Sequence, residues 1–137
     1  GRNEILSWEI GTGSPQAKGQ VGTLGSGDGA FAGPMSLVVG RRDGAHTTDV
    51  YVSDAHNRRV VHLVDQGTSL EWSRSLPHDL GLVTSLDTDH WGNVYAAAPQ
   101  QGVIAKYTPR RPNASNIVST GLMTQAPNIF IRTPSLK

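Results

Sequence analysis

Hydrophobic residues along this chain cluster in short runs, which are separated by turns rich in Gly, Asn, Asp and Pro. Short runs of β-branched and aromatic residues bounded by such turns predict β-strands rather than helices. In the first half of the chain the runs predict strands at Met35–Val39, Val50–Asp54, Arg59–Val64 and Ser69–Arg74. In the second half they predict strands at Thr84–Thr88, Asn93–Ala98, Gly102–Tyr107 and Asn116–Ser119.

The strand pattern repeats with a spacing of 44 residues. The matched positions are Tyr51 and Tyr95, Leu63 and Tyr107, and Leu86 and Phe130. Three matches at one spacing indicate a repeat array, and four short strands per repeat of this length are typical of a β-propeller blade. We therefore expect an all-β propeller, with about three blades of four antiparallel strands in the 137 residues.

The repeat divides the chain into four parts. Residues 1–33 are expected to hold the outer strand of a preceding blade, at Leu6–Ile10, and a Gly-rich connection. Residues 34–80 form a first full blade, 81–125 a second, and 126–137 begin a further one. Because three blades leave two sheet faces open, we expect one of three completions. The remaining blades lie elsewhere in a parent chain, a homodimer completes the ring, or neighbours in an assembly cover the open faces.

Two segments resemble the NHL repeat of β-propeller proteins. Gly25–Pro34 is a Gly-rich lead to Phe and Pro, and Val50–Val61 is a strand ending in Asp followed by a turn and an Asn-Arg-Arg-Val sequence. The second copy keeps Asp89–Tyr95 but has Ala97-Ala98 and Gln101-Gly102-Val103 at the later positions. The resemblance implies an NHL-type propeller, of which this chain would be a part or half of a six-bladed ring.

The amino-acid composition supports β structure and limits the kinds of partner that the chain can bind. The chain has 16 Gly and 8 Pro but only three Glu and three Lys, which are the usual residues of helix surfaces. Its net charge of +1 argues against a broad phosphate-binding face. It has no cysteine, which excludes disulfides and thiolate metal sites. No apolar run approaches the roughly 18 residues of a membrane span.

The ends of the chain do not indicate the cellular compartment of the protein. The sequence opens Gly1-Arg2-Asn3 without Met or an apolar signal segment, so we expect a processed, trimmed or incomplete chain. Asn113-Ala114-Ser115 fits the N-glycosylation pattern, which matters only in a secreted eukaryotic protein. The compartment stays open, and we favour an extracytoplasmic or secreted one.

Asp54 and Arg58 flank a predicted tight turn, and a charge-assisted hydrogen bond between them would hold it. The alternative interpretation is a catalytic acid beside a basic anchor. The second blade has Ala98 and Gly102 at these positions, so the pair is not needed to build a blade. This difference draws attention to the first blade's turn as a ligand contact.

The histidines and carboxylates do not form a recognisable metal site. Propeller enzymes that cleave peptidyl-hydroxyglycine carry a zinc-binding His directly after the Pro that opens the first strand. Here those positions are Met35, Thr84 and Asn128, and Pro77-His78 lies too far from the next strand. Lactonase-like propellers use Glu, Asn and Asp around calcium, but here only Asp87 and Asp89 are near the inner strands. We expect no cofactor and no metal, with a metal-dependent lyase or lactonase as the alternative.

Nucleic acid is the other alternative. Arg41-Arg42, Arg58-Arg59 and Arg110-Arg111 are three basic pairs. They fall in turns on opposite faces of the expected blades, and aromatic residues are only 6% of the chain. Few aromatics mean few platforms on which bases could stack. We interpret these arginines as solvated turn cations, which argues against a nucleic-acid partner, and keep an RNA-binding NHL module as an alternative.

One face remains for recognition, formed by the turns between second and third strands and by the connections between blades. On it we place Phe31, His56, Asn57, Arg58, His78, Asp79, Gln100 and Gln101. A rigid plate of polar turns with a few aromatics suits a protein or peptide partner. The sequence thus predicts a non-catalytic protein-binding or scaffolding module in a larger protein or complex.

Overall fold

The computed structural model describes residues 2–43, 47–76, 81–108 and 117–122, and these are all-β. The strands are β1 (Ile5–Glu9), β2 (Gln16–Val21), β3 (Pro34–Asp43), β4 (Thr47–Asp54), β5 (Arg59–Asp65), β6 (Leu70–Leu76), β7 (Ser85–Thr88), β8 (Val94–Ala98), β9 (Val103–Tyr107) and β10 (Ile117–Leu122). A single 3-10 turn, η1 (Pro99–Gln101), is the only helical element in these ranges. Within them, no helix has the length and apolar character needed to cross a bilayer.

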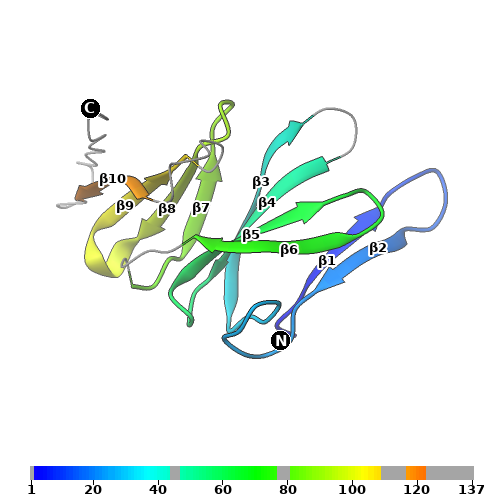
Figure 1. The fold of residues 1–137 in the computed structure, drawn as a ribbon, viewed down its shortest axis with the longest axis horizontal. Coiled ribbons are helices and arrows are strands. Elements are labelled where there is room, and N and C mark those ends of the chain that lie inside the picture. Colours follow the sequence, from blue (N-terminus) through cyan, green and yellow to red (C-terminus); the bar gives the residue numbers. More distant parts are fainter. Residues whose placement is uncertain (1, 44–46, 77–80, 109–116, 123–137) are drawn as a thin grey trace.

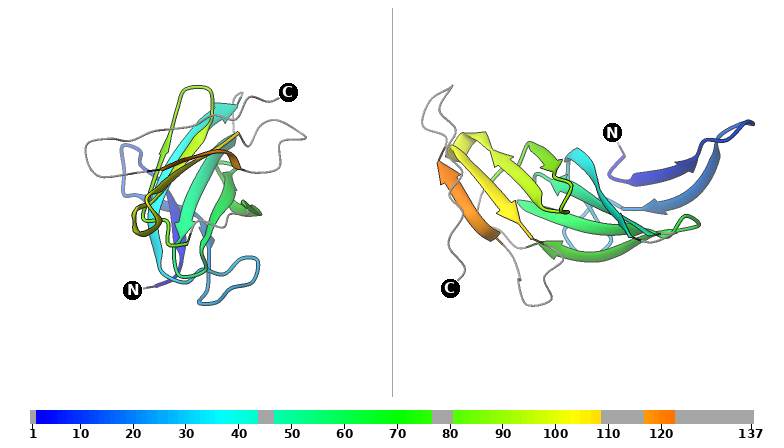
Figure 2. Two further views of the ribbon diagram at one scale, coloured as in Figure 1. Left: turned by 90° about the vertical axis from the view of Figure 1, so that its left-hand side faces the viewer. Right: turned by 90° about the horizontal axis from the view of Figure 1, so that it is seen from above.

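The strands form three antiparallel sheets in chain order, and none of the sheets is closed. The first sheet is the β1-β2 hairpin, the middle sheet is β3-β4-β5-β6, and the third sheet is β7-β8-β9-β10. The sheets stand side by side, with the middle sheet between the other two (Figure 1). Figure 2 shows the same succession of sheets from above.

All eight strands that the sequence predicts in the middle and third sheets are present, with ends that shift by a few residues. Within each of these two sheets, every strand pairs with the next one along the chain, as expected for a four-stranded unit. The all-β prediction is therefore confirmed.

The first sheet differs from the prediction. Leu6–Ile10 was expected to be the last strand of its sheet, but β1 is followed by β2, inside the segment expected to be a connection. β2 packs against β6, and a side chain at Gly19 would collide with the backbone of Leu70. This strand is held by its neighbours rather than by burial of its own residues, so it lacks the apolar run that marks the others.

Two cores lie between the three sheets, because the strands of the middle sheet bury side chains on both faces. On β4, Val50 and Val52 pack toward the first sheet, whereas Tyr51 packs toward the third. This alternation is the period of two expected for a strand. The core shared with the first sheet includes the fully buried Phe31, and the core shared with the third sheet includes Val83.

Candidate functional site

The turn between β4 and β5 is built on the carboxylate of Asp54, which is fully buried. Its oxygens accept hydrogen bonds from the backbone N–H of Ala32 at 2.7 Å, from Nδ2 of Asn57 at 2.8 Å and from Nε of Arg59 at 2.8 Å. Three donors converge on one carboxylate, so the turn and the connection before β3 are fixed to each other.

Arg59, not Arg58, is the partner of Asp54, and the predicted Asp54–Arg58 pair is wrong. Asp54 and Arg59 lie opposite each other in the antiparallel pairing of β4 with β5. Arg58 is at the corner of the turn, with a left-handed backbone (φ 52°) and an exposed side chain. That conformation is rare for a residue other than glycine.

Arg59 is also not the solvated cation that the sequence suggested, since its side chain is only 14% exposed. Its guanidinium donates to the backbone carbonyls of Ser26 at 2.8 Å, Gly27 at 3.1 Å and Ala30 at 2.7 Å. It also lies 5.1 Å from the ring centroid of Trp72, within the range of a cation–π contact. Arg59 therefore ties the Gly-rich connection to the middle sheet.

Four of the predicted site residues do come together. A hollow of about 310 Å³, here called the turn hollow, lies between the β4–β5 turn and η1. Its lining is formed by Ala55, His56, Arg58, Gly81, Leu82, Gln100 and Gln101. The side chains of His56, Arg58, Gln100 and Gln101 are exposed, and no carboxylate is among the lining residues.

Two glycines let the polar side chains of the turn hollow lie close to the backbone. The ring of His56 packs on Gly33, where a Cβ would come within 2.7 Å of Nδ1. The amide of Gln101 packs on Gly81, where a Cβ would come within 2.6 Å of Nε2. Both glycines also have left-handed backbones, with φ values of 65° and 73°. Gly81 and Leu82, which also line the turn hollow, carry no recognisable motif and were not predicted from the sequence.

The other predicted site residues have different positions. Phe31 was expected on the exposed face, but it is fully buried and its ring centroid lies 5.5 Å from that of Trp72. Asn57 donates to the carbonyl of Gly25 and to Asp54, so its side chain is engaged inside the turn. His78 and Asp79 lie outside the described residues. The candidate site therefore reduces to His56, Arg58, Gln100 and Gln101.

A second aspartate organises the turn between β7 and β8. Asp89 accepts hydrogen bonds from the backbone N–H groups of Trp91 and Asn93, from Nδ2 of Asn93 and from the hydroxyl of Tyr95, all at 2.8–3.0 Å. Burial alone would raise the pKa of Asp89, but these donors outweigh it and lower the pKa below the ordinary value of 3.8. The carboxylate of Asp89 therefore shapes its own hairpin.

Within the described ranges, no group of three or more His, Asp or Glu side chains is arranged to hold a metal ion. No protein-family model matches this chain, and no curated protein matches it.

Proposed function

We propose that this chain is part of an NHL-type β-propeller that serves as a non-catalytic protein-binding or scaffolding module. The proposal is supported by the succession of antiparallel sheets in chain order, stacked face to face, and by the 44-residue repeat. The NHL-like segment Gly25–Pro34 is the connection that Arg59 and Asp54 fasten to the middle sheet.

The observation that carries the proposal is the turn hollow. His56, Arg58, Gln100 and Gln101 present hydrogen-bond donors from two neighbouring sheets, and no acidic residue among the lining competes for them. An arginine guanidinium recognises a carboxylate through two parallel hydrogen bonds. We therefore assign the hollow to an acidic side chain or a chain-terminal carboxylate of a protein partner.

The rigidity of the lining favours recognition. The ring of His56 packs on Gly33, and the turn that carries Arg58 is closed by the buried Asp54. A preformed donor set loses little conformational freedom on binding. A carboxylate would thus bind without reorganisation of the turn.

The experiment is an NMR titration of the labelled chain with two capped peptides that differ only in charge, Gly-Ser-Glu-Glu-Gly-Ser and Gly-Ser-Gln-Gln-Gly-Ser. We expect the Glu peptide to shift the amide signals of His56, Gln100 and Gln101, and the Gln peptide to leave them in place. Arg58→Gln should weaken binding about tenfold, because a hydrogen bond to a charged group contributes about 1.5–3 kcal/mol.

The matched control is Arg2→Gln, which removes another exposed arginine far along the chain from the hollow. This variant should bind the Glu peptide as the unaltered chain does. Equal affinity for the two peptides, or shifts that map away from the turn hollow, would contradict the proposed site.

A further inference from the structure

The carboxamide of Gln101 lies flat on Gly81 at one side of the turn hollow. A Cβ at Gly81 would be 2.6 Å from Nε2, 2.7 Å from Cδ and 2.9 Å from Oε1 of Gln101. Three nearly equal distances place that Cβ over the face of the amide. Hydrogen bonds to an amide form near its plane. Both the N–H donors and the C=O acceptor of this exposed side chain are therefore open to a ligand at the edge of the amide.

The positive side of the turn hollow is formed by Arg58 and His56. Nδ1 of His56 is the ring nitrogen next to Gly33, where a Cβ would come within 2.7 Å of it, so Nε2 remains to donate to a ligand. The carboxylate of Asp54, just before the turn, is fully buried and already paired with Arg59. A ligand carboxylate thus meets a guanidinium and an imidazole, with no competing anion among the described lining residues.

The turn hollow also has an apolar part. Ala55, at the start of the β4–β5 turn, is fully buried, and Leu82, before β7, is half-buried. Both belong to the lining, one from the middle sheet and one from the segment that leads into the third sheet. Cationic donors, an amide acceptor and an apolar contact therefore line one hollow of about 310 Å³.

We propose that the turn hollow binds the C-terminal end of a partner protein whose last residue is apolar, an inference that rests on the carboxylate site proposed above. At a chain end, the carboxylate, a peptide N–H and a side chain are all attached to one Cα. Arg58 and His56 donate to the carboxylate, and Oε1 of Gln101 accepts a hydrogen bond from the N–H. Leu82 and Ala55 contact the last side chain. Capture of a terminal carboxylate is a recurring mode of peptide recognition.

An internal glutamate fits this lining less well than a chain end does. Two methylene groups separate its carboxylate from the Cα that carries its own N–H, so the acceptor and the cationic donors are not reached from one compact group. Its chain also continues in both directions, and each further residue advances about 3.3 Å. A chain end is therefore the ligand that uses the donors, the acceptor and the apolar contact together.

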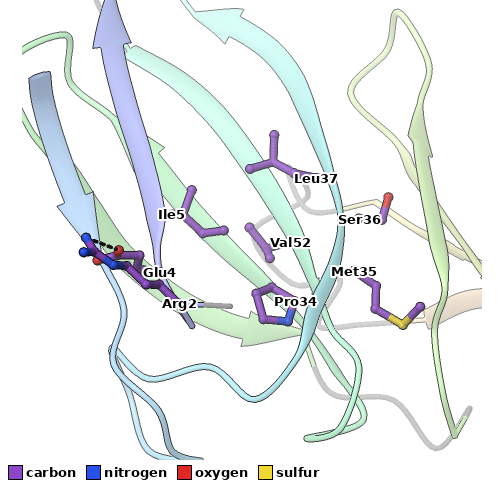
Figure 3. A pocket seen from close by; sticks show the side chains of 8 residues that line it. All are labelled: Arg2, Glu4, Ile5, Pro34, Met35, Ser36, Leu37 and Val52. Carbon is purple, nitrogen blue, oxygen red and sulfur yellow. Dashed lines mark hydrogen bonds and ion pairs between the residues drawn. The ribbon is translucent and has the colours of Figure 1, made fainter. Parts of the chain in front are cut away.

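A second hollow, of about 280 Å³ between β1 and β3, has a lining of different charge. Figure 3 shows its two charged residues, Arg2 and Glu4, which form an ion pair at 3.5 Å. A carboxylate in this hollow would meet the negative charge of Glu4. Because the two hollows are similar in volume, a ligand that binds by size alone would occupy both. The second hollow is therefore an internal control for the experiment.

The experiment is an NMR titration of the labelled chain with N-acetylated peptides. Gly-Ser-Gly-Ser-Gly-Val with a free carboxylate should shift the amide signals of His56, Gln100 and Gln101, and leave those of Ser36 and Leu37 in the second hollow in place. The same peptide with a C-terminal amide should bind about tenfold more weakly, because hydrogen bonds to a charged group are lost. A peptide ending in Gly should bind about fivefold more weakly, because it lacks the apolar side chain. The capped Glu peptide should also bind more weakly than the free Val peptide.

Gln101→Leu tests the acceptor, because it removes the amide and keeps a side chain of similar size. It should weaken binding of the free Val peptide about fivefold, as expected for one neutral hydrogen bond, and leave binding of the capped Glu peptide unchanged. Methylation of the last peptide nitrogen should have a similar effect on the unaltered chain and no further effect on Gln101→Leu. The matched control is Gln66→Leu, the same change on an exposed glutamine between β5 and β6, which should bind as the unaltered chain does.

The outcomes separate this inference from the proposed function. A capped Glu peptide that binds as tightly as the free Val peptide would overturn the chain-end inference and leave the carboxylate site standing. Equal affinity for the free and the amidated Val peptides would also overturn the inference, and so would an equal effect of N-methylation on the unaltered chain and on Gln101→Leu. If no peptide shifted the signals of the turn hollow, the proposed function would fail together with the inference.

Discussion

The middle and third sheets have the same order of four antiparallel strands, but a different turn in each is stabilised by a buried or half-buried aspartate. Asp54, at the end of β4, is fully buried and is neutralised by the guanidinium of Arg59. Asp89, in the hairpin that opens the third sheet, is half-buried and bound only by neutral donors from Asn93, Tyr95 and the backbone. At the positions of Asp54 and Arg59, the third sheet has Ala98 and Val103, which lie opposite each other in the pairing of β8 with β9.

The difference follows from the connection that each sheet must hold. The connection before β3 spans 22–33 and turns its carbonyls toward Arg59, which donates to three of them. Of the connection before β7, the structure describes residues 81–84, in which Val83 is fully buried and its carbonyl accepts a hydrogen bond from the Ser53 hydroxyl. In the described residues, the connection before β3 is therefore held by an ion pair and by hydrogen bonds to its carbonyls, whereas the connection before β7 is held by the burial of Val83 and one hydrogen bond.

The largest expected effect comes from removing the apolar anchor of each connection. Phe31→Ala should lower the free energy of unfolding by about 4 kcal/mol, since a buried Phe loses both its transfer energy and its contact with Trp72. Val83→Ala should cost less, about 2 kcal/mol, because fewer atoms are removed. Urea denaturation of both variants measures the difference. Equal losses would show that the two connections are anchored alike.

Asp54→Ala should cause the next largest loss in the free energy of unfolding. It leaves the guanidinium of Arg59 without its partner in a largely buried position, which costs about 3 kcal/mol in comparable pairs. The control is Asp28→Ala, on an exposed aspartate of the same connection, which should change stability by less than about 0.5 kcal/mol. The same urea denaturation measures both. If Asp54→Ala and Asp28→Ala lowered the free energy of unfolding equally, the connection would not depend on the ion pair.

Sequence alone predicted the strands of the middle and third sheets because their apolar residues are buried against neighbouring sheets. It missed β2, in which Ala17 and Val21 are the only apolar residues and Gly19 permits the approach to β6. Pairing with β1 and packing on β6 form that strand, and neither contact is encoded in its own composition.

The candidate site was predictable in part. The position of a turn along the repeat was enough to group His56 and Arg58 with Gln100 and Gln101. The wrong partner for Asp54 arose because nothing in the sequence marks a left-handed arginine at position 58. The β4–β5 turn has four residues, 55–58, so Arg59 is the residue that lies opposite Asp54, and this register would have identified Arg59 as its partner. Phe31 was misplaced because an aromatic in a Gly-rich segment can be either an exposed contact or a buried anchor.

The smallest expected effect is the pH dependence of the third sheet's aspartate. The pKa of Asp89 is lowered in the folded chain, so its contribution to stability is fully present above the ordinary value of 3.8 and is lost as the pH falls through the lowered pKa. Asp89→Asn should therefore destabilise the chain at neutral pH and progressively less in acid. The effect is small because Asp89 is half-exposed and solvent screens it. Thermal unfolding of the Asp89→Asn variant and of the unaltered chain, at neutral pH and at a pH below 3.8, measures this difference in stability.

Tyr95→Phe removes one of the hydrogen-bond donors to Asp89 and should raise the pKa of Asp89, which NMR titration of the carboxyl carbon detects. A constant difference in stability between Asp89→Asn and the unaltered chain across this range would show that the neutral donors hold the protonated and the ionised carboxyl equally well.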